Sequence, residues 1–220
     1  MKTQKEKLKE LFKNVYFING TAYAGKSTMV RTLAEKYDGI ACGENYHDAL
    51  LDTLDRAEFP GLCYTRDLQD WRLFIRRTPQ EYSDWIDSTA KECEILELRI
   101  LEELASTTNK PIFVDTNICV ETLKEISGEN NVVIMLADHD ISVKRFFDRP
   151  DREKQFLYKL LMEEENPQRA MENYRRGLSL INSQEKYDAF LNSGFPVVLR
   201  DESRTVEQTA SLVAEIFKLK

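Results

Sequence analysis

The residues with the clearest chemical potential lie in residues 15–29, VYFINGTAYAGKSTM, where an apolar run leads into a loop containing two glycines. Gly20, Gly25, Lys26 and Ser27 match the phosphate-binding pattern G-x-x-x-x-G-K-[ST] at every fixed position. Such a loop wraps successive backbone N–H groups around a polyphosphate, and the helix that follows adds the positive end of its dipole. The predicted phosphate-binding residues are Gly20, Thr21, Ala22, Tyr23, Ala24, Gly25, Lys26, Ser27 and Thr28.

Within this loop we assign three separate roles. Lys26 is expected to reach the β- and γ-phosphates, and Ser27 offers a hydroxyl oxygen to Mg²⁺, which prefers hard oxygen ligands. Thr28 adds an expected α-phosphate contact. The alternative is a glycine turn without a ligand. We disfavour it because the bare pattern arises by chance in roughly one chain in a hundred, and the strand-like and helix-like flanks make it rarer.

A second candidate metal ligand ends a later apolar run, residues 111–115. Asp115 closes this run, and the carboxyl ends of neighbouring parallel strands meet at one edge of a sheet. We therefore expect Asp115 to hold the Mg²⁺ shell beside Ser27. The alternative is that Asp115 or Thr116 caps a following helix that ends near Gly128.

A cluster of arginines follows the fourth strand-like run. Arg145 and Arg149 are four residues apart, which predicts one helical face, and Arg152 follows the interruption at Pro150. Guanidinium groups stay cationic and bond two phosphoryl oxygens at once, so these three arginines are candidate catalytic residues of a lid at about 144–176. The alternative is a solvated helix held by salt bridges.

A long helical excursion, about 44–106, separates the second and third strand-like runs and offers room for a second substrate. The sequence Thr78-Pro79-Gln80-Glu81 is a capping box, and it predicts the start of a helix of about seven turns with one buried face. From the polar residues before this helix we select Arg66, Arg72 and Arg76 as substrate-binding candidates.

The whole chain alternates strand-like and helix-like segments. The expected strands are residues 15–18, 39–42, 111–115, 131–137 and 196–199, with a helix at about 206–217 closing the chain. Near-continuous apolar strands suit a parallel sheet that is covered by helices on both faces. We therefore predict one α/β domain over residues 1–220.

Composition narrows the partners. The formal net charge of -7 and the pI near 5.1 argue against general affinity for nucleic acid or for an anionic membrane. No apolar run approaches the length of a membrane span, so we expect a cytoplasmic protein. The four cysteines are widely separated, which predicts free buried thiols and disfavours a structural zinc site.

Taken together, these residues resemble the P-loop small-molecule and nucleotide kinases, among them nucleoside monophosphate kinases, shikimate-type kinases and chloramphenicol phosphotransferase. The resemblance covers nearly the whole chain in layout, with specific support only at residues 20–28, Asp115 and residues 145–152. It implies a three-layer P-loop NTPase fold with a five-stranded parallel sheet in the order 2-3-1-4-5 and helices on both faces. It also implies ATP and Mg²⁺ as cofactors and a helical lid that carries the arginines.

The resemblance also points to an acceptor base. Similar kinases place a carboxylate just after the second strand to take or orient the proton of the acceptor hydroxyl, which implies Glu44, with Asp48 as a second candidate. A solvated loop carboxylate is the alternative for either residue. The sequence departs from adenylate kinases, which have D-G-F-P-R where residues 115–117 stand here, and it lacks the E-R-S motif of nucleoside kinases.

Two functional classes remain open at this point. The first is an ATP-dependent phosphotransferase whose partners are a nucleotide and a small-molecule acceptor carrying a hydroxyl or a phosphate. The second is a switch that binds a protein partner and hydrolyses ATP or GTP slowly. The absence of an N-K-x-D motif favours ATP over GTP. The acceptor itself stays open among nucleotides, nucleosides, sugars, acids and antibiotics.

Overall fold

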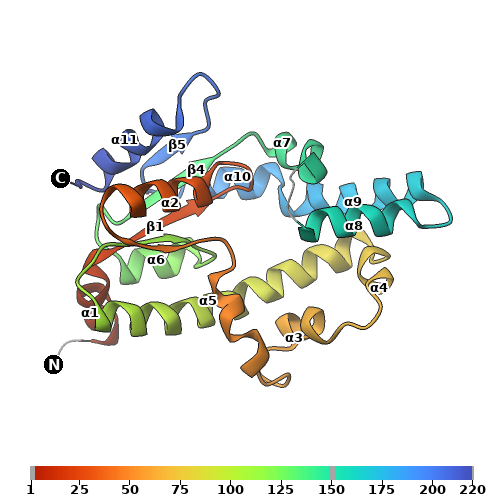
Figure 1. Ribbon diagram of the computed structural model, residues 1–220, viewed down its shortest axis with the longest axis horizontal. Coiled ribbons are helices and arrows are strands. Elements are labelled where there is room, and N and C mark those ends of the chain that lie inside the picture. The colour runs from red at the N-terminus through yellow and green to blue at the C-terminus, as the bar shows by residue number, and fades with distance from the viewer. Residues whose placement is uncertain (1–2, 149–151, 220) are drawn as a thin grey trace.

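A five-stranded parallel sheet forms the centre of the computed structural model, which describes residues 3–148 and 152–219 (Figure 1). The strands are β1 (Val15–Gly20), β2 (Ile40–Cys42), β3 (Ile112–Asp115), β4 (Val132–Leu136) and β5 (Val197–Leu199). Their order is β2-β3-β1-β4-β5, and each neighbouring pair is parallel. Strands β3 and β4 are buried at every position because both faces of the sheet are covered. The predicted strands and their order are confirmed.

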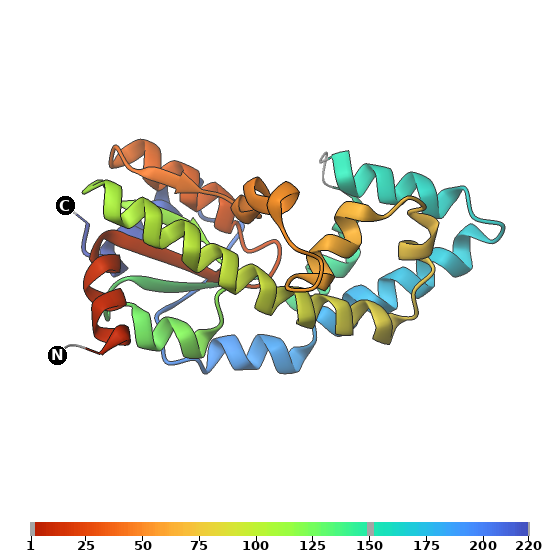
Figure 2. The ribbon, with the colours of Figure 1, turned by 90° about the horizontal axis from the view of Figure 1, so that it is seen from below.

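Helices cover both faces of the sheet (Figure 2). One face packs against α2 (Lys26–Lys36) and α11 (Val206–Ile216). The other packs against α1 (Gln4–Leu11), α6 (Val120–Ile126), α10 (Gln184–Leu191) and the carboxyl-terminal half of α5 (Pro79–Thr107). Alternate strand residues supply the two cores: Ile18 faces α2 and α11, whereas Phe17 faces the other layer.

The remaining elements form a helical lobe beyond the carboxyl ends of the strands, at the right of Figure 1. They are the 3₁₀ helices η2 (Tyr46–Thr53) and η3 (Phe146–Asp148), the helices α3 (Pro60–Asp67), α4 (Arg72–Ile75), α7 (His139–Lys144), α8 (Arg152–Met162) and α9 (Pro167–Ile181), and the first half of α5. Phe74, Leu161 and Leu178 belong to one apolar core that joins α4, α8 and α9. The predicted excursion and the predicted lid therefore pack together.

Helix α5 spans the molecule and carries residues of both the sheet layer and the lobe. Its start at the Thr78 capping box is confirmed, and it has 29 residues, about eight turns. The helical spacing of its apolar residues predicts Ile100 and Leu104 on the buried face, but the structure buries Leu101 and leaves Ile100 and Leu104 half-buried. Two acidic residues, Glu92 and Glu97, are also buried on this helix because they bind polar groups of neighbouring segments.

The segment after β3 corrects one alternative from the sequence. Helix α6 begins at Val120 and is capped by Cys119, so neither Asp115 nor Thr116 caps it. A four-residue loop separates the end of β3 from the helix. Asp115 thus faces the predicted phosphate-binding loop, residues 20–28, which is called the phosphate loop below. Cys119 is exposed, whereas the other three cysteines are buried, and all four are free thiols. Among the described residues, none of the helices has the length and apolarity that a membrane crossing requires.

Candidate active site

The loop between β1 and α2 is shaped by its two glycines. Gly20 has φ +126°, and a Cβ there would lie 2.0 Å from the carbonyl oxygen of Met135 on the neighbouring strand β4. Gly25 has φ +91°, and a Cβ there would meet nothing within 4 Å. Only glycine adopts these conformations readily. Strand packing therefore requires the first glycine, and the turn into α2 requires the second.

Hydrogen bonds with the segments that follow β4 and β5 hold the loop in place. The Thr21 hydroxyl accepts a bond from the Ala137 N–H at 2.8 Å, just beyond β4. The Tyr23 hydroxyl donates to the backbone carbonyl of Arg145, and the Arg200 guanidinium donates to the backbone carbonyl of Tyr23. The loop is thus fixed from both the β4 and the β5 ends of the sheet, so its backbone N–H groups keep one arrangement.

The start of α2, like the starts of α3 and α4, has no side-chain cap from its N-cap residue, unlike those of several longer helices. Helices α1, α5 and α11 begin with a threonine whose hydroxyl accepts a bond from the third helical residue. Helix α2 begins after Gly25, and no side chain caps it. An uncapped amino terminus presents N–H donors and the positive end of the helix dipole, which is the arrangement that binds anions.

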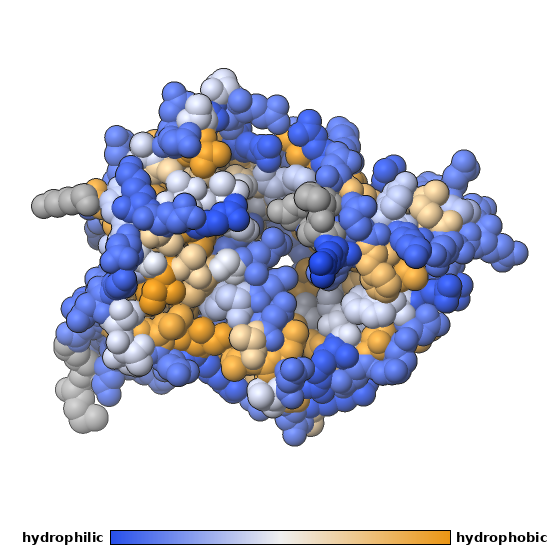
Figure 3. Space-filling view, in the orientation of Figure 1, coloured by the Kyte–Doolittle hydropathy of each residue, from blue (hydrophilic) through white to orange (hydrophobic). Residues whose placement is uncertain are grey.

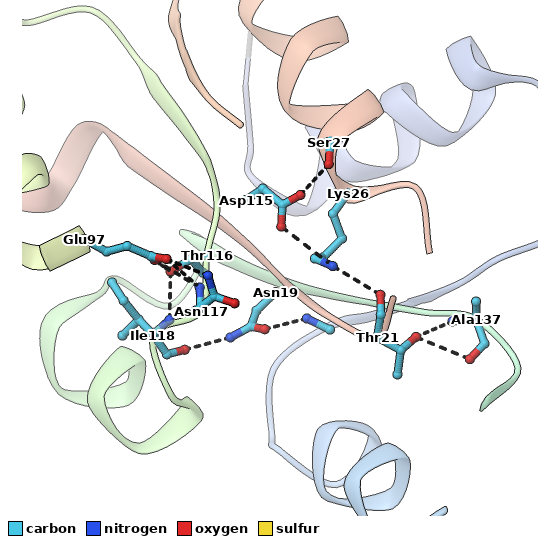
Figure 4. Close-up of polar contacts among 11 residues, drawn as sticks. Asn19, Thr21, Lys26, Ser27, Glu97, Asp115, Thr116, Asn117, Ile118 and Ala137 are labelled. Carbon is cyan, nitrogen blue, oxygen red and sulfur yellow. Dashed lines mark hydrogen bonds and ion pairs between the residues drawn. The ribbon is translucent and has the colours of Figure 1, made fainter. Parts of the chain in front are cut away.

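Lys26, Ser27 and Asp115 meet at the mouth of the loop (Figure 4). The Ser27 hydroxyl donates to Asp115 Oδ2 at 2.7 Å, and Lys26 Nζ lies 3.7 Å from Asp115 Oδ1 and 3.2 Å from the carbonyl oxygen of Thr21. The structure places Asp115 here because β3 lies beside β1, with Asp115 opposite Ile18. It thereby brings together the two residues that the sequence predicted as metal ligands.

The environment of Asp115 is both buried and charged. Burial raises the pKa of its carboxyl group, the charges of Glu44 and Glu97 add to this effect, and Lys26 and Ser27 oppose it. The paired hydroxyl and carboxylate oxygens fit Mg²⁺, which takes one or two protein oxygens and completes its shell with phosphate and water. Over residues 3–148 and 152–219 there is no larger group of acidic, His and Cys side chains that would hold a metal on its own.

A cavity of about 500 Å³ lies beside the carboxyl end of β3, between η2, α3, α5 and α8. Its walls include both tryptophans of the chain, Trp71 and Trp85, together with Phe74 and Phe156. Asn117, two residues after Asp115, also lines it, so the cavity reaches the segment that follows β3. Figure 3 shows the surface hollowed where the sheet layer meets the helical lobe.

A buried polar network supports the wall of this aromatic cavity. Glu97 is fully buried and accepts hydrogen bonds from the Thr116 hydroxyl at 2.7 Å and from the Asn117 backbone and side-chain amides at 3.0 and 2.8 Å. His47 places Nδ1 3.4 Å from Glu97 Oε1, and its Nε2 lies 3.2 Å from Cys93 Sγ. The network fixes the loop after β3 against α5. The sequence did not single out Glu97, because a glutamate in a helix is usually exposed.

The two candidate bases take different places. Asp48 lines the aromatic cavity, and its Oδ1 lies 3.7 Å from His47 Nε2. Burial raises the pKa of Asp48, and the neighbouring His47 opposes this shift. Glu44 does not line the cavity, but its charge acts on Asp115 and so lies toward the phosphate loop. Of the two candidate bases, only Asp48 therefore lines the cavity.

The three arginines predicted to bind substrate do not converge. Arg66 lines the aromatic cavity, where its Nε and Nη2 donate to the two oxygens of Asp67 at 2.7 and 3.0 Å. Arg72 and Arg76 instead pair with Glu163 and Glu164, the acidic residues that follow α8. Arg76 lines a separate hollow of about 630 Å³ that shares no residue with the aromatic cavity.

The predicted lid arginines are also separated. Arg145 follows the last residue of α7, and its Nη1 lies 3.6 Å from Glu202 Oε1, close to the phosphate loop. Arg152 is exposed at the start of α8. The predicted single helical face is wrong because α7 ends before Arg145 and a 3₁₀ turn follows. Arg149 lies outside the described residues.

The sequence did not reveal a second cavity, of about 380 Å³, beside the phosphate loop. Gly25 and Thr28 line one side, and Met135, Val198 and the segment 200–206 after β5 line the other. Its only signal in the sequence is the run of polar residues between the last strand and the last helix, which is typical of many loops.

The phosphate loop and Asp115 thus lie together at one edge of the sheet. The aromatic cavity lies at the same edge, beside the carboxyl end of β3. Neither the comparison with models of known protein families nor the comparison with curated proteins finds a match for this chain. The functional assignment therefore depends on the geometry of these groups.

Proposed function

We propose that this protein is an ATP-dependent phosphotransferase that moves the γ-phosphoryl group of Mg-ATP to a small acceptor. The observation that carries the proposal is the Lys26–Ser27–Asp115 cluster at an uncapped helix start, next to a cavity of molecular size. Phosphoryl transfer needs little more than positioning and charge neutralisation, and this arrangement offers both.

The nucleotide side uses the glycine loop. Backbone N–H groups of the loop and of the first turn of α2 bind the phosphates, and Lys26 adds a positive charge. Ser27 and Asp115 would hold Mg²⁺, which supplies charge neutralisation for the phosphate oxygens when it is bound. The neighbouring cavity of about 380 Å³ combines apolar walls at Met135 and Val198 with polar groups, a composition that suits the base and ribose.

The acceptor side uses the aromatic cavity. Asn117 on its wall follows Asp115 by two residues, which supports an acceptor hydroxyl bound here being within reach of the phosphate loop, and the helical lobe would exclude water from the transfer. We assign Asp48 as the group that takes the proton of the acceptor hydroxyl, because it lines this cavity and a carboxylate accepts that proton in comparable reactions. Glu44, nearer to Asp115, is the competing assignment.

The aromatic cavity also favours a transferase over a regulatory switch. A switch has no use for a cavity that is large enough for a second small molecule. The predicted lid shares an apolar core with α4 and α5: α8 supplies Glu153 and Phe156 to the wall of the aromatic cavity, and α9 packs against α5 and α8.

The decisive test compares Lys26→Ala with the wild type for ADP release, using a library of acceptors read above the background without acceptor. We expect at least about a hundredfold loss of turnover, because a charge that is poised on the transferring group is removed. Lys36→Ala, at the far end of the same helix, serves as the matched control. Far-UV circular dichroism checks the fold. A Lys26→Ala protein that keeps most of its activity would refute the proposed function.

A further inference from the structure

The side chains that line the aromatic cavity indicate which chemical class of acceptor would bind there. Building on the proposed function, we infer that the acceptor is a neutral or cationic alcohol with a flat aromatic ring, and not an anion such as a phosphomonoester. Both the rings on the cavity wall and the charges that line it favour such a ligand.

Aromatic rings build one side of the cavity as a rigid unit. Trp71 packs edge-on against Phe74, with ring centroids 5.5 Å apart, and against Phe156 at 5.8 Å. Phe74 packs edge-on against Trp85 at 5.1 Å. All four rings line the cavity. Rings that are fixed by one another lose little entropy when a ligand binds, and they offer the edge-to-face and offset contacts that a flat ring prefers.

The charged groups on the lining are acidic apart from one arginine. They are Asp48, Glu153 and Arg66. Arg66 is already occupied: Asp67 takes its Nε and Nη2, and its Nη1 donates to the carbonyls of Leu51 and Leu54 at 2.9 and 2.8 Å. The guanidinium in turn holds the pKa of Asp67 below its usual range, so this pair stays ionised.

A phosphate group on the acceptor would therefore meet poor surroundings. Proteins bind phosphomonoesters with arginine forks or lysines that are free to donate. Within the part of the chain that the structure describes, the lining has no lysine or arginine besides Arg66, and the ring nitrogens of its one histidine, His47, lie beside Glu97 and Cys93. The carboxylate of Asp48 would repel a dianion, whereas it attracts an amine and accepts a hydrogen bond from a hydroxyl.

Arg77 packs on the rings near the cavity but does not line it. Its guanidinium carbon lies 4.2 Å from the ring centroid of Tyr64 and 5.4 Å from that of Trp85. Arg77 does not line the cavity, and its guanidinium makes cation–π contacts with these rings.

The test uses tryptophan fluorescence, because the only two tryptophans of the chain both line the cavity. The full-length protein without ATP is titrated with three probes of similar size: p-methylbenzyl alcohol, p-(aminomethyl)benzyl alcohol and p-(hydroxymethyl)benzoate. We expect the neutral and cationic probes to bind at least about tenfold more tightly than the anionic one, as expected for one charge at close range.

Two variants each remove one negative charge at or beside the cavity. Asp48→Asn should reduce the ratio of cationic-probe affinity to anionic-probe affinity. Asp67→Asn should strengthen binding of the anionic probe because it releases the Arg66 guanidinium. Asp87→Asn, an exposed position on α5 outside the cavity lining, is the control and should leave the order unchanged. Thermal melts establish that each variant is folded, and either of the two variants suffices if the other does not fold.

Three results would overturn the inference: equal or tighter binding of the benzoate to the wild type, no quenching by any probe at its highest soluble concentration, or, in folded Asp48→Asn or Asp67→Asn protein, the same ratio of cationic-probe to anionic-probe affinity as in the wild type. The titrations contain no ATP, so any of these results leaves the proposed transferase function standing. Conversely, an active Lys26→Ala protein would remove the transferase function without affecting the order of probe binding.

Discussion

Replacing Gly20 and Gly25 of the phosphate loop by alanine, one at a time, should distinguish the role of Gly20 in packing against β4 from the role of Gly25 in phosphate binding. Both residues have positive φ, at +126° for Gly20 and +91° for Gly25. Their surroundings differ, because an added Cβ would overlap the backbone carbonyl of Met135 at Gly20, 2.0 Å away, and would meet nothing within 4 Å at Gly25. The same substitution therefore tests two different physical effects.

The expected magnitudes follow from this difference. A left-handed alanine costs about 1–2 kcal/mol, which is the whole expected loss of stability at Gly25. At Gly20 the overlap with β4 adds about 1–3 kcal/mol, because two hydrogen-bonded strands must separate, so the total is about 2–5 kcal/mol. For a chain of this size these values correspond to melting points lower by about 2–8 °C for Gly25→Ala and by about 4–20 °C for Gly20→Ala.

Binding should follow the reverse order. In Gly25→Ala the new methyl group projects into open space at the start of α2, where we expect the phosphates. Calorimetric Mg-ATP binding should weaken by at least about tenfold, or about 1.4 kcal/mol. Gly43→Ala is the control, since its Cβ also meets nothing within 4 Å and its φ is not in the positive region. Wild-type ATP affinity in Gly25→Ala, or an equal loss of stability in the two loop variants, would refute this reasoning.

Two further predictions concern the carboxylates of the site. Burial raises the pKa of Asp115, so the folded protein holds its proton more tightly than the unfolded chain does, and the ionised form lowers stability. Asp115→Asn should therefore melt at a higher temperature than the wild type at neutral pH, and this difference in melting temperature should shrink as the pH falls through the raised pKa. ADP release by the variant should need more Mg²⁺. A lower melting point with unchanged Mg²⁺ dependence would contradict the metal role. For the acceptor base, Asp48→Asn should cut kcat by about a hundredfold or more with ATP binding unchanged, whereas Glu44→Gln should act less strongly, and steady-state kinetics showing the reverse order would move the assignment to Glu44.

The sequence by itself determined the local features. The phosphate loop could be predicted because its glycines, Lys26 and Ser27 lie within eight consecutive residues, so chain connectivity alone brings them together. The strands and the start of α5 were predictable for the same reason, since period, apolar runs and the Thr78 capping box are short-range signals. The resemblance to P-loop kinases added the strand order, which is observed.

Only the tertiary structure decided which distant residues share a cavity. Arg66, Arg72 and Arg76 look equivalent in the sequence, yet only Arg66 lines the aromatic cavity, because Arg72 on α4 and Arg76 just after it pair with Glu163 and Glu164 beyond the end of α8. Glu97 and its contact with His47 depend on how α5 crosses the end of β3, which no local pattern encodes. Pairings between segments so far apart are set by packing of the whole core, and for that reason sequence patterns could not predict the lining of the aromatic cavity.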